Sequence, residues 1–149
     1  MSARFGATYF WIRHGIQLTG NAMKMYDPLK PPNPEEWQSM DEQERLDLVE
    51  GFHRRARIRV PNAKVHAVIH VIVENQFALG DELPVKRTVQ RLMSEGLDRH
   101  DAIHAVGSVL IGHISDLLGA PEAEVGADPN PPYYAALDQL TAKDWSSSG

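Results

Sequence analysis

The sequence of 149 residues contains no cysteine. Disulfide bonds, thiolate zinc sites, iron–sulfur clusters and the c-type haem attachment motif are therefore excluded. Any bound metal ion must take its protein ligands from histidine, aspartate and glutamate side chains. A chain of this length buries a core without covalent or metal staples, so we expect a single domain.

Long apolar runs and a net positive charge are also absent. No stretch approaches the roughly 20 apolar residues that span a bilayer, and the apolar segment at residues 5–12 is short for a signal peptide. The formal net charge of −5 argues against a protein whose main role is to bind nucleic acid or an anionic membrane. The dense basic run at residues 53–59 suits a solvated helix end, with an anion contact as the alternative. We expect a cytoplasmic protein with no nucleic-acid partner and no membrane partner.

Proline divides the chain into an irregular and a regular part. The segment YDPLKPPNP, residues 26–34, carries four prolines, which lock the backbone angle and remove hydrogen-bond donors. We expect an irregular Pro-rich arm at residues 1–38, packed on the rest of the protein and anchored by Trp11 and Trp37. A helical bundle domain at residues 39–142 follows, and a Ser-rich tail at residues 143–149 is expected to be disordered.

Capping residues and apolar spacing predict helices throughout residues 39–142. Ser39 followed by Glu42 has the pattern of a capping box, and Asn62 and Asp98 are typical N-caps. The expected helices are 39–57, 62–79, 84–95, 98–118 and 132–142. The segment VIHVIVENQF is rich in β-branched residues, as a buried strand would be, but its polar and aromatic positions recur at helical spacing. The predicted fold is all-α, a single bundle of four to five helices.

Histidines recur on the inner edges of three of these helices. His66 and His70 are four residues apart on the helix at 62–79, and His100 and His104 on the helix at 98–118. His53 lies within the apolar arc of the helix at 39–57. His113 falls on the other flank of its helix and His14 in the arm, so five of the seven histidines are expected to converge in the interior.

Histidines four residues apart on a helix lie about 6 Å apart at Cβ and can bind one ion together. The predicted site therefore holds a divalent transition metal, zinc, iron or manganese. Its expected ligands are His66, His70, His100 and His104, with Glu74 or His53 as a further ligand. If one coordination position stays open, the metal lowers the pKa of bound water, and Asp101 is then the candidate general base in hydrolysis.

The segment HDAIH, residues 100–104, resembles the zincin motif His-Glu-x-x-His, in which two histidines ligate zinc and the glutamate activates bound water. The resemblance implies zinc ligation by His100 and His104, with Asp101 in place of that glutamate. Leu110 stands where the metzincin branch has its third histidine. The segments EGFH (50–53) and HVIVE (70–74) resemble the Glu-x-x-His and His-x-x-x-Glu spacings of diiron helical bundles.

Residues 66–107 are similar to a family of small bacterial helical proteins whose function is uncharacterised. These proteins carry a His-x-x-x-His helix followed by a turn and helix like GLDRHDAIHAVG. This resemblance implies a bacterial-type helical unit and no particular chemistry.

The competing interpretation is a small interaction or structural module without catalysis. In it the histidines are polar contacts of the core, each satisfied by a backbone carbonyl or a carboxylate. The acidic helices and the Pro-rich arm then dock a protein partner or a second copy of the chain. Metal content of the purified protein separates the two interpretations.

Overall fold

The computed structural model describes residues 25–120 and 126–148. These residues form seven α-helices and one short 3-10 helix, and no strand occurs among them. The elements are α2 (Pro34–Ser39), α3 (Glu42–Arg55), α4 (Ala63–Ala78), η1 (Gly80–Glu82), α5 (Val85–Ser94), α6 (Arg99–Gly119), α7 (Pro131–Gln139) and α8 (Ala142–Ser147). The predicted all-α fold is confirmed, and VIHVIVENQF is helical rather than extended.

Several of the predicted helix ends are confirmed. Asn62 accepts a first-turn N–H of α4 at 3.1 Å, and Asp98 accepts a first-turn N–H of α6 at 2.8 Å. Gly80 and Gly96 follow α4 and α5 with φ angles of 63° and 117°, in the left-handed region that glycine tolerates best. These ends set where the histidine-bearing helices α4 and α6 begin, and therefore which turns carry the imidazoles.

The predicted start of the first helix is wrong. Asn33 accepts two first-turn N–H groups and Pro34 suits the first helical position, so α2 begins within the arm expected to be irregular. Ser39 ends α2 instead of capping the next helix. Asp41 caps α3 in a capping box, in which Asp41 and Glu44 each accept the other's backbone N–H at 2.8 and 2.9 Å.

The C-terminal segment is helical where disorder was expected. Thr141 caps α8 by accepting the Asp144 N–H at 3.1 Å. Trp145 is partly buried and packs against the larger apolar cluster. A side-chain cap and an indole held by the bundle therefore order residues through Ser147.

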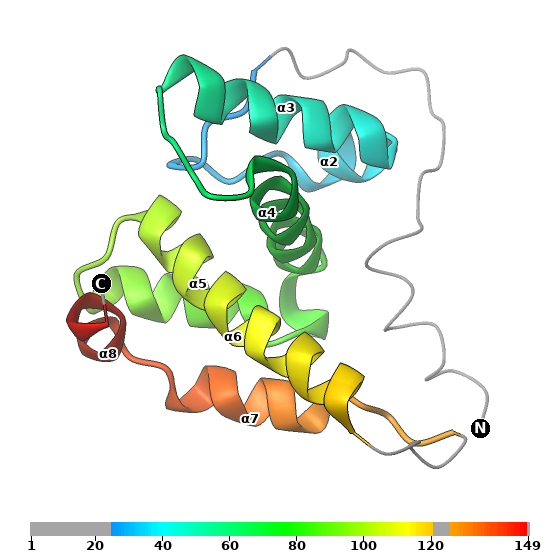
Figure 1. Cartoon of the computed structure of the whole chain (residues 1–149), viewed down its shortest axis with the longest axis vertical. Coiled ribbons are helices and arrows are strands. Elements are labelled where there is room, and N and C mark those ends of the chain that lie inside the picture. Colours follow the sequence, from blue (N-terminus) through cyan, green and yellow to red (C-terminus); the bar gives the residue numbers. More distant parts are fainter. Residues whose placement is uncertain (1–24, 121–125, 149) are drawn as a thin grey trace.

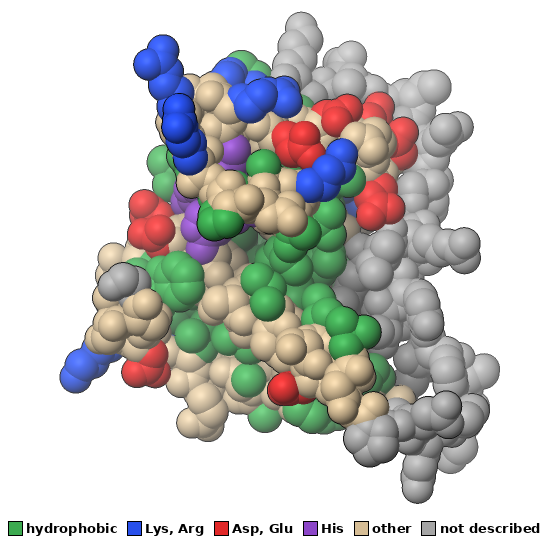
Figure 2. All heavy atoms as spheres, in the orientation of Figure 1, with side chains coloured by type: hydrophobic (Ala, Val, Ile, Leu, Met, Phe, Trp, Pro, Cys, Tyr) green, Lys and Arg blue, Asp and Glu red, His purple; other side chains and the backbone are tan. Residues whose placement is uncertain are grey.

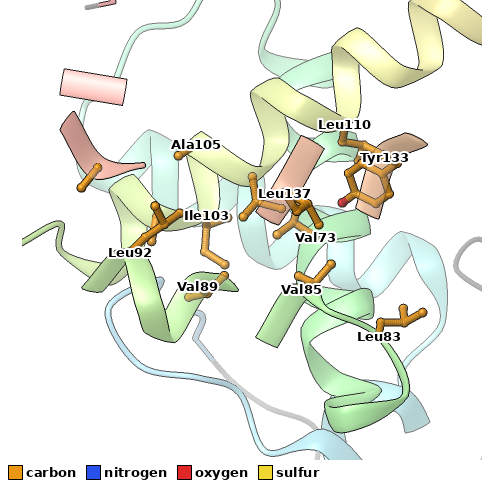
Figure 3. Packing of buried hydrophobic residues seen from close by; sticks show 13 residues of the cluster. Val73, Leu83, Val85, Val89, Leu92, Ile103, Ala105, Leu110, Tyr133 and Leu137 are labelled. Atoms are coloured by element: carbon orange, nitrogen blue, oxygen red, sulfur yellow. The ribbon is translucent and has the colours of Figure 1, made fainter. Parts of the chain in front are cut away.

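α4 stands between two groups of helices (Figure 1). α2 and α3 pack against it on one side, α5 and α6 on the other, and α7 and α8 pack on α6. The smaller apolar cluster consists of Tyr26, Trp37, Met40, Leu46, Val49, Ala67 and Val71. The larger cluster (Figure 3) includes Val73, Leu83, Val85, Val89, Leu92, Ile103, Leu110, Tyr133 and Leu137. Because α4 contributes to both clusters, the part of α4 that carries histidines lies where the two meet.

Trp37 anchors the Pro-rich segment to the bundle, as predicted. Its side chain is fully buried, and its indole N–H donates to the side-chain oxygen of Asn75 on α4 at 2.8 Å. The ring of Tyr26 packs against it with centroids 5.8 Å apart. This anchor carries the Tyr26 hydroxyl into the interior beside α4. The second predicted anchor, Trp11, lies outside the described residues.

Within the described part of the chain, α6 alone is long and apolar enough to cross a membrane by length and composition. The expectation that no stretch is long and apolar enough to span a bilayer therefore does not hold for α6, by length and composition. A helix at the centre of a bundle meets the same criterion, and α6 packs against α4, α5, α7 and α8. The absence of a membrane partner stays a prediction.

Candidate metal centre

Five imidazoles from three helices meet where α3, α4 and α6 approach one another. We call His53, His66, His70, His100 and His104 the imidazole cluster. One ring nitrogen from each of His53, His70, His100 and His104 lies within 4.8 Å of the others. His66 lies beside them, with its Nε2 3.0 Å from Nε2 of His53. Figure 2 shows part of this histidine group in a hollow of the surface. The cluster could hold a metal ion.

Two imidazoles of the cluster are oriented by hydrogen bonds from their outer nitrogens. His53 Nδ1 lies 2.8 Å from the Val49 carbonyl oxygen, and because a carbonyl only accepts, Nδ1 carries the proton. His70 Nδ1 lies 3.1 Å from the Tyr26 hydroxyl oxygen. Fixing the proton on Nδ1 leaves a lone pair on Nε2, which is how metal-ligating histidines are commonly held. In His70 this nitrogen has no partner among the described residues, and in His53 it lies 3.0 Å from His66 Nε2.

The Tyr26 hydroxyl belongs to a buried polar chain that ends on an ion pair. Tyr26 donates to Glu74 Oε1, so its oxygen accepts from His70 Nδ1–H. Both oxygens of Glu74 accept from the Arg99 guanidinium at 2.8 Å. Arg99 also donates to the Pro28 carbonyl at 2.9 Å. We call this the Arg99–Glu74–Tyr26 chain. It positions the His70 ring through the hydrogen bond between the Tyr26 hydroxyl and His70 Nδ1.

Glu74 therefore occupies a different place from the one expected. Its spacing from His70 predicted a further metal ligand, but it does not belong to the group of mutually close ligand atoms, and both of its oxygens are engaged. The physical reason is Arg99, a buried cation whose charge needs a buried partner. Glu74 supports a histidine of the cluster through Tyr26, and its role as a metal ligand stays a prediction that this position does not favour.

The inner nitrogens of three imidazoles have no hydrogen-bond partner among the described residues. Nε2 of His70, His100 and His104 is buried in each case. Leaving a buried polar atom unpaired costs about 1–3 kcal/mol, and native interiors avoid this cost. Three of the buried atoms without a partner among the described residues thus lie together in this cluster.

Burial lowers the pKa of His66, His70, His100 and His104, and neighbouring imidazoles lower each of these pKa values further. The pKa of His70 is well below its usual value, and that of His104 falls to about 3. These imidazoles are therefore neutral near pH 7, which is the form that binds metal. Burial also raises the pKa of Tyr26 well above its usual value, so its hydroxyl keeps its proton and stays a donor to Glu74.

Asp101 lies away from the cluster. Its side chain is exposed and lines a separate surface hollow with Leu97 and Trp145. Asp101 follows His100 in the sequence, but on a helix adjacent residues point about 100° apart, so His100 faces inward and Asp101 outward. The role of Asp101 as a general base stays a prediction that this position does not favour.

Glu50 is the carboxylate that the structure does bring beside the cluster. It lines a cavity of about 200 Å³ together with His53 and His66. Its Oε1 is buried and without a hydrogen-bond partner among the described residues. The spacing of Glu50 to His53 is visible in the sequence, but Glu50 was not among the predicted site residues.

His113 does not join the cluster. His113 is buried on the opposite flank of α6, where it stacks on Tyr133 with ring centroids 5.3 Å apart. His14 lies outside the described residues. The contributions of Tyr26 and Arg99 were not predicted from the sequence. Nothing in the local pattern around either residue signals that they meet Glu74.

Comparison of the chain with protein-family models, with curated proteins and with solved structures finds no match. The resemblance of residues 66–107 to a family of small bacterial proteins therefore remains a resemblance. The geometry of the imidazole cluster is what bears on function.

Proposed function

We propose that the protein binds one divalent transition-metal ion through His53, His70, His100 and His104. The observation that carries this proposal is the set of three buried Nε2 atoms without a hydrogen-bond partner among the described residues. His113, a buried imidazole of α6 outside the cluster, also has an Nε2 without a partner among the described residues. The proposal therefore rests on three such atoms gathered in one cluster whose ligand nitrogens lie within 4.8 Å of one another.

The donor set favours particular metals. Imidazole nitrogens suit zinc, iron, copper and nickel, whereas manganese prefers carboxylate and carbonyl oxygens. Glu74 is held by Arg99, so the inner set consists of imidazoles. Zinc and iron are therefore better candidates than manganese.

The spacing of the four imidazole nitrogens requires that they move closer together to bind one ion. Zinc–nitrogen bonds of 2.0–2.1 Å separate the ligand atoms of a tetrahedral site by about 3.3 Å. The four nitrogens lie within 4.8 Å of one another, so they must approach by about 1.5 Å at most.

The number of bound imidazoles decides whether the metal is structural or reactive. Four imidazoles close a tetrahedral zinc site, whereas three leave a position for water, whose pKa the metal then lowers. Metal-assisted hydrolysis belongs to the second case. Glu50, which shares a cavity with His53 and His66, is then a better-placed proton acceptor than the exposed Asp101.

The competing function, a non-catalytic module with histidines as core contacts, is favoured by one observation. His53 and His66 approach at 3.0 Å between their Nε2 atoms, and a neutral His66 can donate to His53 at this distance without an ion. This contact accounts for two imidazoles and leaves the other three unexplained.

The test is the metal content and metal affinity of the full chain. Protein stripped with chelator and reloaded with zinc or ferrous iron should bind about one equivalent. His104→Ala should lower the affinity well beyond 10-fold, since changes behind a ligand already cost about 10–100-fold. Cobalt loading should give the visible absorption spectrum expected of a tetrahedral or five-coordinate ion.

His113→Ala is the matched control, because it also truncates a buried imidazole of α6. It should lose stability as a cavity variant does and keep the metal affinity of the wild type. If the wild type binds neither metal, or if His104→Ala and His113→Ala keep the same affinity, the proposal is overturned and the histidines are core contacts.

A further inference from the structure

An apolar pocket opens directly onto the imidazole cluster. It has a volume of about 350 Å³, near the lower end of the range for small-molecule sites. α4 and α6 form its walls, with Trp145 of α8 at its rim. The lining residues are Val60, Pro61, Asn62, Val65, His66, Ile69, His70, Ile103, His104, Gly107, Ser108, Ile111 and Trp145.

Among the residues that the structure describes, no Asp, Glu, Lys or Arg side chain lines this pocket. Its two neutral polar side chains are already engaged with the backbone. Asn62 accepts the Val65 N–H at 3.1 Å as the cap of α4, and Ser108 donates to the Ala105 carbonyl at 2.7 Å. The polar side chains left most available to a ligand include the imidazoles of His66, His70 and His104.

Two of those imidazoles present unpaired nitrogens. Nε2 of His70 and Nε2 of His104 are buried and have no hydrogen-bond partner among the described residues. The His70 side chain is only 2% exposed, although it lines the pocket. The pocket therefore combines a mainly apolar lining with two imidazoles whose unpaired nitrogens lie buried beside it.

Gly107 allows this wall to form. A Cβ atom added at Gly107 would lie 3.0 Å from Ile69 Cγ2, which is tighter than ordinary contact. The absence of a side chain lets α6 approach α4 closely and places His104, one turn away, at the end of the pocket. The pocket is thus a feature of the α4–α6 packing.

We propose that this pocket binds a small, uncharged, mainly apolar molecule with a single polar group, and that this group reaches the ion held by the imidazole cluster at a coordination position left open by three imidazoles or gained by expansion to five ligands. The contact to the ion rests on the metal centre proposed above, whereas the apolar contacts do not. A lining of apolar side chains and neutral imidazoles disfavours charged ligands, whose desolvation would go uncompensated. A neutral aliphatic or aromatic alcohol, amide or ester has the required chemistry.

The apolar part is tested with butanol, hexanol and octanol on the metal-free full chain, followed by tryptophan fluorescence. Trp145 lines the pocket, and Trp145→Phe identifies its share of the signal. Each added methylene should tighten binding about fourfold until the pocket is full. No saturable binding, or affinity independent of chain length, overturns the pocket.

Ile111→Glu places a charge in the pocket wall at a position that is 50% exposed, so the fold tolerates it. Hexanol binding should fall at least 10-fold. Leu118→Glu is the matched control, because Leu118 lies on the same helix, is 84% exposed and does not line the pocket. Equal loss in both variants, or no loss in Ile111→Glu, contradicts the assigned site.

The contact to the ion is tested separately with hexanohydroxamic acid, whose head group is neutral in solution and releases its proton when its oxygens bind zinc. Zinc-loaded protein should bind it at least 10-fold more tightly than metal-free protein, and His104→Ala should abolish this gain. Chain-length-dependent alcohol binding without any gain on zinc loading overturns the contact to the ion and leaves the apolar pocket, whereas failure of the stripped protein to take up zinc overturns the metal centre. Zinc binding without alcohol binding overturns the pocket and leaves the metal centre.

Discussion

The buried ion pair between Arg99 and Glu74 is predicted to be a strongly coupled element of this fold. Their side chains are 2% and 0% exposed, and two parallel hydrogen bonds of 2.8 Å join them. Removing one partner leaves a buried charge without compensation, which costs about 3–5 kcal/mol. We therefore expect Arg99→Met and Glu74→Gln each to lower the free energy of unfolding by about that amount.

The double variant should be much more stable than the two single costs imply. With both charges gone, the amide that replaces the Glu74 carboxylate would still accept from Tyr26, so the main remaining loss is the Arg99 bond to the Pro28 carbonyl. Replacing a buried pair by neutral groups is often close to neutral. The coupling energy from the double-mutant cycle should therefore be at least about 3 kcal/mol.

Urea unfolding of metal-free protein near neutral pH, followed by far-ultraviolet circular dichroism, measures this cycle. The matched control is Arg87 with Asp138, an ion pair at 3.9 Å whose side chains are 68% and 60% exposed. Its cycle should show no resolvable coupling, because solvent screens exposed pairs. Additive single costs at Arg99 and Glu74, within about 0.5 kcal/mol, would refute the reasoning.

Two further predictions concern the histidines and their support. Because the folded-state pKa values of His70 and His104 lie below the unfolded value, the unfolded chain binds more protons below about pH 6.5. The free energy of unfolding of metal-free protein should therefore be constant above that pH and fall on acidification. His70 alone should lower this free energy by about 1.4 kcal/mol per pH unit. A flat profile in urea titrations between about pH 7 and pH 5 would contradict this prediction. Tyr26→Phe removes the hydroxyl between His70 and Glu74, so it should cost about 1–3 kcal/mol of stability and weaken zinc binding about 10–100-fold. Competition with a chromophoric chelator measures the affinity, and a value equal to that of the wild type would show that the hydroxyl does not support the site.

The histidine positions were accessible from the sequence because helical periodicity is local. A spacing of four residues places His66 and His70 on one face of their helix, and His100 and His104 on one face of theirs, independently of the rest of the chain. The apolar arcs of the same helices indicated that these faces turn inward. The convergence of five imidazoles was therefore predictable once the helices had been assigned.

The neighbours of those imidazoles were not accessible in the same way. Glu74 shares a helix face with His70, which made it a natural candidate ligand. Arg99, 25 positions further along the chain, forms an ion pair with it instead. The Tyr26 hydroxyl contacts His70, which is 44 positions away in the sequence. The prolines of the segment that carries Tyr26 predict only that this segment is irregular. Asp101 was assigned from its place in a motif, whereas the direction of its side chain follows from which face of α6 meets α4.

The sequence by itself determined the helical class, most of the caps and the faces that carry histidine, because each depends on residues within one or two turns. The missing cysteines also restricted the donor set without any structure. Only the tertiary structure decided which carboxylate lies beside the cluster, that a buried arginine pairs with Glu74, and that an apolar pocket is lined by histidines of the cluster. These features depend on how α3, α4 and α6 pack. Packing is decided by the joint fit of side chains distant in sequence, which no local pattern records.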